Sequence, residues 1–230
     1  MIALRGNPMR VADLFCSFSG EVGVAIPQGS MVTFLRFAGC PLECAWCDTP
    51  ETQPILSGSC IPIVSLKQML VEFGGHYLII TGGEPAIQPK LEMLLNVIAP
   101  MYDKIVIETS GGFDLSYMRE VSKEKISFCV DYKLPSSGVH ENYVGKFNYS
   151  KLGSSDVIKF PIATEDDAKL AIMVAKELQE KFMLADIPML AFSLVGSWPE
   201  GSADWLFEEL SFHRINGTIN VQVHKILCVK

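Results

Sequence analysis

Three cysteines that lie close together are the residues of this chain most able to do chemistry. Cys40, Cys44 and Cys47 occur in the run CPLECAWC, directly after an apolar stretch. Closed zinc sites and ordinary iron–sulfur clusters usually take four ligands. A cubane [4Fe–4S] cluster that is held by three thiolates keeps one iron open to a small molecule. The spacing therefore predicts a reactive metal centre. A structural zinc site with a remote fourth ligand, such as Cys60 or a histidine, stays the alternative.

Two short polar segments follow apolar runs further along the chain. Residues 81–85 read TGGEP, where paired glycines let a backbone approach a ligand closely and the proline can open the next helix. Residues 108–111 read ETSG. Taken alone, each segment is as readily a tight turn at the end of a strand, so both depend on the cysteines for a functional interpretation.

The elements that must position these residues are short β-branched runs that alternate with helix-like segments. Strands are predicted at 32–37, 77–81, 104–108, 126–131, 156–160, 189–193 and 220–224, and helices at 65–73, 89–99, 164–182 and 205–215. Ser65 with Gln68 and Thr164 with Asp167 have the spacing of capping boxes. This alternation is typical of βα units and a parallel sheet, whose active face is formed by the loops after the strands. Residues 17–30, 50–62 and 135–149 are expected to be irregular.

The bulk composition favours an enzyme that acts on a small molecule. The 230 residues, 49% of them hydrophobic, can form a sizeable core, and no linker or repeat divides them, so we expect a single α/β domain over 1–230. No apolar run reaches the roughly 20 residues of a membrane span, and the N-terminus does not resemble a signal peptide. The net charge of −7 argues against a general nucleic-acid binder. Seven cysteines without a disulfide-like spacing fit a reducing, cytoplasmic compartment.

The cysteine motif, with the aromatic Trp46 before its last cysteine, resembles that of the radical S-adenosylmethionine (SAM) superfamily. The resemblance implies that the three cysteines hold a [4Fe–4S] cluster whose open iron binds SAM, and that one electron splits SAM to methionine and a 5′-deoxyadenosyl radical. It also implies a partial (β/α) barrel with a reduced set of helices. The SAM-binding residues that it implies are Trp46, Gly82, Gly83, Glu84, Glu108, Ser110 and Lys133.

A second set of motifs resembles one family within this superfamily, the 7-carboxy-7-deazaguanine synthases. The motifs are SFSGEVG at 17–23, the LRFAGC run that contains Arg36, CDT at 47–49, DYKLPSSG at 131–138 and QVHK at 222–225. They occur in the same order as in the family and cover about 15–225, nearly the whole chain. The resemblance implies conversion of 6-carboxy-5,6,7,8-tetrahydropterin to 7-carboxy-7-deazaguanine, a ring contraction with loss of ammonia, in the biosynthesis of queuosine and related deazapurines.

The same resemblance implies further ligands and partners. Mg²⁺ would bind Thr49, the electron donor would be a flavodoxin or ferredoxin, and the protein would be a homodimer. The implied substrate-binding residues are Phe18, Ser19, Gly20, Glu21, Arg36, Thr81 and His224. Arg36 would face the substrate carboxylate, which a guanidinium can bind with two hydrogen bonds. From the residues alone, Thr49 is favoured as a loop cap, His224 as a structural residue, and Arg36 is as readily a surface ion-pair partner.

Several positions depart from the family pattern and leave other functions open. Ser19 stands where the family usually has Gln, Val22 is inserted into the usual Glu-Gly pair, and residues 191–194 lack an expected Gln-Pro segment. Pro50-Glu51 after the cysteines is reminiscent of activases that abstract a hydrogen from a glycine of a partner protein. Such an activase is the first alternative function, and a non-catalytic zinc module is the second.

Overall fold

All nine strands in the described part of the chain belong to one open sheet. The computed structural model describes residues 8–143, 149, 151–182, 186–196, 198 and 201–229. The strands are β1 (Pro8–Phe18), β2 (Met31–Phe37), β3 (Ser59–Pro62), β4 (Tyr77–Gly82), β5 (Lys104–Thr109), β6 (Ile126–Asp131), β7 (Val157–Ile162), β8 (Met189–Leu194) and β9 (Gly217–Ile219). Their order is β3-β1-β2-β4-β5-β6-β7-β8-β9. All pairs from β2 to β9 are parallel, whereas β1 runs antiparallel to both β2 and β3.

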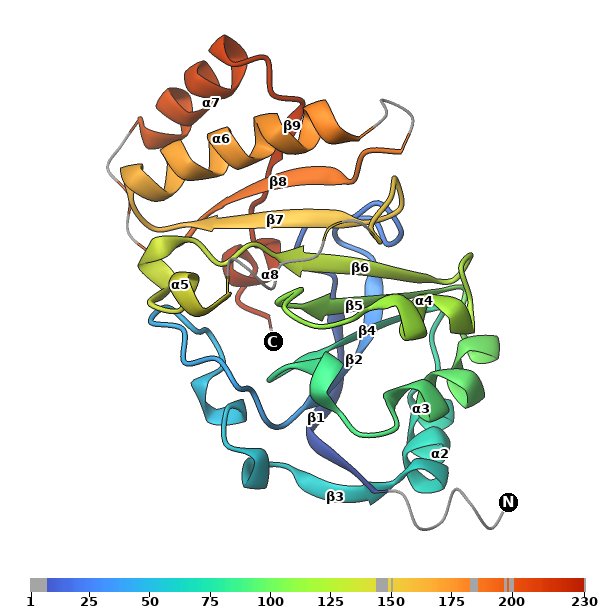
Figure 1. The fold of residues 1–230 in the computed structure, drawn as a ribbon. Coiled ribbons are helices and arrows are strands. Elements are labelled where there is room, and N and C mark those ends of the chain that lie inside the picture. Colours follow the sequence, from blue (N-terminus) through green and yellow to red (C-terminus); the bar gives the residue numbers. More distant parts are fainter. Residues whose placement is uncertain are drawn as a thin grey trace.

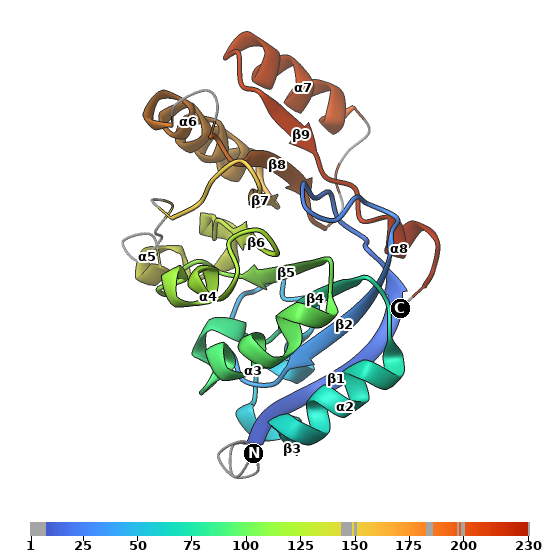
Figure 2. The ribbon, with the colours of Figure 1, turned by 90° about the vertical axis from the view of Figure 1, so that its right-hand side faces the viewer.

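This architecture confirms the predicted α/β fold with a partial barrel. Because β3 and β9 are the two edges and do not pair with each other, the barrel is not closed. The helices are α2 (Ile63–Phe73), α3 (Leu91–Ile98), α4 (Ser116–Val121), α5 (His140–Tyr143), α6 (Glu165–Lys181), α7 (Ser202–Phe212) and α8 (Val223–Ile226). Figure 2 shows α3, α4 and α6 on one side of the sheet, and α8 with the loop between β1 and β2 on the other. No helix in the described ranges combines the length and apolar character needed to cross a membrane.

The main core lies between the sheet and the helices that cover it. On α3 one apolar face is buried, with Leu91, Leu94, Leu95 and Ile98 at most 1% exposed. The longest helix, α6, begins with the predicted capping box, in which the Thr164 side chain accepts from the Asp167 N–H and the Asp167 side chain accepts from the Thr164 N–H. A short 3₁₀ helix, η5 (Pro135–Ser137), precedes α5 in the loop after β6.

Three expectations about single elements are wrong. The strand predicted at 220–224 is replaced by β9, which ends at Ile219, and by α8. The pattern misled because residues 220–222 direct several polar groups to the loop between β1 and β2, and only Asn220 still hydrogen-bonds to β8. Helix α2 has Pro62 as its N-cap, so Ser65 is inside it, because burying Ile63 extends the helix by two residues. Strands β1 and β3 cover residues expected to be irregular or left unassigned.

The parallel strands bring the functional segments to one edge of the sheet. The arrows of β5, β6 and β7 end on the same side, where the loop after β2 and α5 also lie (Figure 1). That loop contains the three cysteines, and residues 81–85, 108–111 and 131–138 end or follow β4, β5 and β6 in the same way. Parallel pairing of these strands is therefore enough to bring the segments that follow them together around one site.

Candidate active site

A cavity of about 650 Å³ opens at this edge of the sheet. The predicted site residues that line it are Cys40, Cys44, Cys47, Trp46, Thr49, Gly82, Gly83, Glu84, Glu108, Ser110, Lys133, Phe18, Gly20, Glu21, Arg36, Thr81 and His224. Ser19 does not line this cavity: it is 4% exposed, its backbone pairs with Ser30 and Gly29, and its side chain borders a much smaller cavity of about 20 Å³ behind the loop. The structure thus brings together all the predicted residues except Ser19.

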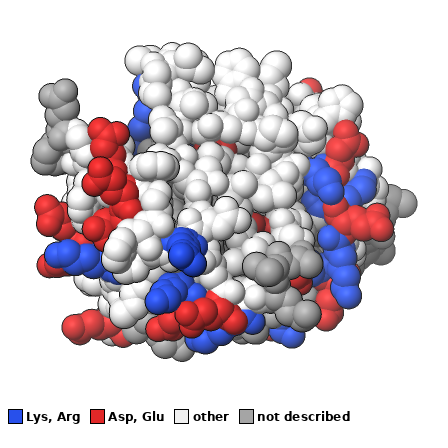
Figure 3. Space-filling view, turned by 90° about the horizontal axis from the view of Figure 1, so that it is seen from above, with Lys and Arg blue, Asp and Glu red and all other residues white. Residues whose placement is uncertain are grey.

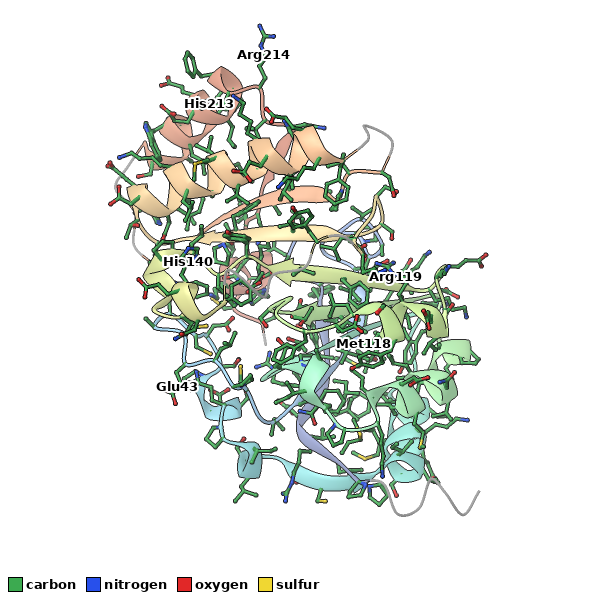
Figure 4. All side chains as sticks on the ribbon, viewed as in Figure 1. Glu43, Met118, Arg119, His140, His213 and Arg214 are labelled. Carbon is green, nitrogen blue, oxygen red and sulfur yellow. The ribbon has the colours of Figure 1, made fainter. Side chains whose placement is uncertain are left out.

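The three cysteines occupy one exposed loop between β2 and the short 3₁₀ helix η1 (Pro50–Thr52). All three are free thiols that line the cavity, whereas Glu43, between the first two, points away from the sheet (Figure 4). Burial raises the pKa of Cys40 to about 11 and also raises the pKa of Cys44, although the Lys133 ammonium acts to lower both. Cys40 and Cys44 are therefore protonated at neutral pH and must lose their protons when they bind metal.

The donor set of this loop fits a cluster better than a single ion. Within the part of the chain that the structure describes, no three His, Cys, Asp or Glu side chains are grouped so that they could hold one metal ion. An iron–sulfur cluster presents several irons, so its thiolate ligands surround it instead of meeting at one point. Cys60, the remote ligand considered for zinc, lies on β3 and does not line the cavity.

Backbone contacts fix the beginning of the cysteine loop against the TGGEP segment. Gly83 N–H donates to Phe37 O at 2.9 Å, and Glu84 N–H donates to Gly39 O at 2.8 Å. A Cβ atom at Gly83 would lie 2.1 Å from Gly39 O, so only glycine allows this approach. The expectation was that the paired glycines approach a ligand. In this structure, the backbone that Gly83 approaches is that of the cysteine loop itself.

Glu84 joins the TGGEP and ETSG segments and uses both carboxylate oxygens to do so. One oxygen accepts from Ala86 N–H at 2.9 Å and from Thr109 Oγ1 at 2.6 Å. The other accepts from Ser110 N–H at 2.8 Å and from Ser110 Oγ at 2.7 Å. Because the side chain is only 1% exposed and makes four hydrogen bonds, it holds the ends of β4 and β5 in register at the cavity wall.

The far end of the cysteine loop rests on the segment after β6. Trp46 Nε1 donates to Ser136 Oγ at 3.0 Å, and Ala45 N–H donates to Ser137 O at 2.9 Å. The Lys133 ammonium lies 5.1 Å from the centre of the Trp46 ring, a cation–π distance. The PSSG segment thus supports the loop that carries the thiols.

Beginning at Lys133, acidic and basic side chains of the cavity wall form a linked network. Lys159 Nζ lies 2.6 Å from Glu21 Oε2 and 3.0 Å from Asp131 Oδ1, and Lys133 Nζ lies 2.8 Å from Asp131 Oδ2. Gln222 Nε2 donates to the other oxygen of Glu21 at 2.7 Å. Asp131, Lys159 and Gln222 line the cavity and were not predicted as site residues. A lysine in the apolar strand 156–160 was the one available signal for Lys159.

Arg36 is a basic group of the cavity whose hydrogen-bonding capacity is not used up. Its guanidinium lies 5.6 Å from the centre of the Phe15 ring, and its Nε atom is buried without a hydrogen-bond partner among the described residues. A buried, unpaired donor of this kind costs free energy unless a ligand or water pairs with it. The alternative that Arg36 forms a surface ion pair has no counterpart among the ion pairs of the described residues.

Gly20 and His224 are far apart in the sequence but contact each other at the site. A Cβ atom at Gly20 would lie 1.7 Å from His224 Nδ1, so the imidazole packs on the glycine backbone. The Val223 N–H also donates to Gly20 O at 2.9 Å. Burial lowers the pKa of His224, which favours the neutral imidazole. His224 therefore reaches the cavity from α8, not from the strand that was expected.

Comparisons with known proteins agree with this fold and site. The model of the radical SAM superfamily matches residues 35–143. The 7-carboxy-7-deazaguanine synthase of Clostridium acetobutylicum is 30% identical over 223 residues, which cover 95% of this chain and 95% of that protein. The synthase of Leptospira interrogans is 26% identical, with 94% of each chain covered.

Solved structures show the same fold. QueE from Escherichia coli superposes with a TM-score of 0.64 at 20% identity, covering 96% of this chain and 97% of that one. SuiB of Streptococcus suis, in a structure bound to S-adenosylmethionine, gives a TM-score of 0.52 at 13% identity and covers 81% of this chain and 48% of that one. With the near-complete match to the clostridial enzyme, these findings show that the chain belongs to the 7-carboxy-7-deazaguanine synthase family of radical SAM proteins.

Proposed function

We propose that this protein converts 6-carboxy-5,6,7,8-tetrahydropterin to 7-carboxy-7-deazaguanine. The observation that carries the proposal is the buried Nε of Arg36, which has no partner among the described residues and belongs to a side chain lining the cavity. A carboxylate is the group that a guanidinium pairs with best. Glu21 lines the same cavity and can accept from the N–H groups along the pterin edge.

The cofactors of the family fit the residues at the other end of the cavity. The three cysteines would hold a [4Fe–4S] cluster, and Trp46, Gly82, Gly83, Glu84, Glu108, Ser110 and Lys133 would surround SAM. When bound, cluster and SAM supply the 5′-deoxyadenosyl radical. The chain's own residues orient these groups: Glu84 fixes the strand ends, and Ser136 supports the cysteine loop through Trp46.

Thr49 is proposed as the magnesium ligand. Thr49 is the N-cap of η1, but its side chain makes no capping hydrogen bond, and only its carbonyl accepts from the Thr52 N–H and hydroxyl. From the residues alone, the Thr49 hydroxyl was expected to cap the loop, and in the structure it does not. The Thr49 side chain lines the cavity, where it could bind Mg²⁺, a cation that prefers oxygen ligands and could also contact an anionic substrate.

The partners and location are part of the same proposal. A flavodoxin or ferredoxin would supply the electron, in a cytoplasmic compartment that keeps thiols reduced. A homodimer is supported by α7, which exposes Phe207 and Phe212 by 66% and 81%. Figure 3 shows that the face seen from above has a mostly uncharged middle, with charged side chains toward its left, right and lower margins. Large exposed aromatic side chains of this kind are typical of interaction surfaces.

The test is anaerobic turnover of the reconstituted protein with SAM, dithionite, Mg²⁺ and 6-carboxytetrahydropterin, followed by mass spectrometry. We expect 7-carboxy-7-deazaguanine and ammonia. The Arg36→Met variant should bind SAM normally but form the product with a substrate KM raised at least about tenfold, because a charged hydrogen bond is lost. Arg119→Met is no suitable control, since that side chain holds Ile126 O and Asp156. Exposed Arg214→Met is the matched control. SAM cleavage without any deazapurine would refute the substrate assignment.

A further inference from the structure

Lys159 is the one charged side chain of β7, whose other residues are apolar. The side chain lines the cavity but is only 14% exposed. An ammonium group in such a place is stable only if carboxylates compensate its lost hydration. The positions of its partners therefore indicate why a lysine stands in this strand.

Two carboxylates from separate parts of the chain meet at this ammonium. Asp131 is the direct neighbour of Lys159 in the parallel β6–β7 register, and its Oδ1 lies 3.0 Å from Nζ. Glu21 comes from the loop after β1, 138 residues away in sequence, and its Oε2 lies 2.6 Å from Nζ. Lys159 thus ties the loop between β1 and β2 to the inner wall of the sheet.

The charged surroundings of Lys159 come from every neighbouring element. Glu21 faces it from the loop after β1, Glu108 from β5, and Cys129 and Asp131 from β6, while Lys133 pairs with the other side of Asp131 and His224 faces Glu21 from α8. Strand β8 has no ionisable side chain. The three carboxylates of Glu21, Glu108 and Asp131 therefore share two ammonium groups. Loss of Lys159 would leave them only the ammonium group of Lys133.

The pKa values of two of these groups already reflect the network. Burial and then the Glu21 charge raise the pKa of Glu108 to about 7, and Lys159 opposes this rise. Although burial acts to raise it, Lys133 and Lys159 lower the pKa of Asp131 to about 2. Without Lys159, the pKa of Glu108 would rise further, so Glu108 would be protonated at a higher pH than it is now.

We propose that Lys159 is a positioning residue for substrate binding, which fixes the Glu21 carboxylate at the cavity wall so that it can accept from the N–H groups of the pterin edge. Each Glu21 oxygen already accepts one hydrogen bond, from Lys159 or from Gln222. An ionised carboxylate has about four acceptor sites, so two remain for a ligand. The inference rests on the proposed function, because the ligand is its pterin substrate.

The test measures binding of 6-carboxypterin, the oxidised and unreactive analogue, to the cluster-loaded protein by calorimetry across neutral pH. We expect Lys159→Gln to weaken binding about tenfold or more. The midpoint, which is the pH at which binding is half lost on acidification, should rise by about one pH unit. Without the Lys159 charge, the carboxylates of the network keep their protons to a higher pH. Lys159→Arg retains the charge and should restore the midpoint. Lys169→Gln, at an exposed position of α6, is the matched control.

Either of two results would overturn the inference: Lys159→Gln with the parent's affinity and midpoint, or Lys159→Arg with the defect of Lys159→Gln. If the glutamine variant does not fold, the double variant Lys159→Gln/Asp131→Asn removes opposite charges together and should fold while still binding about tenfold more weakly. Parent affinity in that double variant would also overturn it. If the unmodified protein neither binds 6-carboxypterin nor forms deazaguanine, the proposed function fails; if it does both, only the role of Lys159 is at stake.

Discussion

At the scale of single residues, the cavity wall contains polar groups that the chain itself satisfies and polar groups that it does not. Glu84 has four hydrogen bonds and little capacity left for a ligand. The Arg36 Nε has no partner among the described residues, and the Thr49 hydroxyl makes no cap. Buried donors in folded proteins are nearly always paired, so the unpaired Nε of Arg36, whose side chain lines the cavity, indicates a position for a ligand.

The hydroxyl of Thr49 supports a prediction about magnesium. Thr49→Val should leave the melting temperature nearly unchanged, because the hydroxyl makes no capping bond that the fold would lose. Turnover should fall about tenfold, and addition of Mg²⁺ should no longer increase it, since an oxygen ligand is gone. Thr49→Ser keeps the oxygen and is the matched control. An unchanged magnesium response in the valine variant would mean that the ion binds elsewhere.

Not every residue of the site could be recognised from the sequence. The cysteines were predicted from their type and spacing, whereas the glycines and Arg36 were assigned through motifs that resemble those of the family. Asp131 and Lys159 were missed because their role depends on a cross-strand pairing between positions 28 residues apart. Ser19 was predicted to bind substrate but does not line the large cavity, since its backbone pairs with Ser30, and this pairing is not visible in the local sequence.

At the scale of elements, the N-terminus of α6 is linked to the cysteine loop through Asp167. One carboxylate oxygen of Asp167 accepts from the N–H groups of Ala163 and Thr164, and the other accepts from Ser136 N–H at 3.0 Å. Ser136 in turn accepts from the Trp46 indole. The capping residue of a helix thereby sets the position of the segment on which the cysteine loop rests.

This link predicts that Asp167 affects the cluster although it does not touch it. Asp167→Ala should lower the free energy of unfolding by about 3 kcal/mol, because buried donors lose a charged acceptor. It should also broaden the electron paramagnetic resonance signal of the reduced cluster, since the cysteine loop loses its support. Thr164→Ala removes the other half of the same capping box, costs about 1 kcal/mol, and should leave the signal unchanged. An identical spectral change in both variants would contradict the link through Ser136.

At the scale of the whole molecule, the strands and long helices predicted from the sequence follow from local patterns. Six predicted strands and α6 are present because buried parallel strands and amphipathic helices have clear periodicity. By contrast, β1 and β3 pair antiparallel at one edge of the sheet, and their mixed apolar and polar residues do not indicate this. The end of the chain was misjudged for a related reason: residues beyond Ile219 pack against the loop between β1 and β2, which is distant in sequence.

The C-terminal segment is predicted to serve the site rather than the core. The last buried apolar residue of the main core is Ile215, whereas Gln222 and His224 line the cavity. A chain that ends at Val221 should therefore keep its cluster and melt within about 5 °C of the parent. Its affinity for 6-carboxypterin should fall about tenfold or more, because Glu21 loses the hydrogen bond from the Gln222 amide and the His224 ring no longer packs on Gly20. A chain that ends at Cys228 is the control and should bind normally. Loss of the cluster in the shorter chain would instead make this segment part of the folding core.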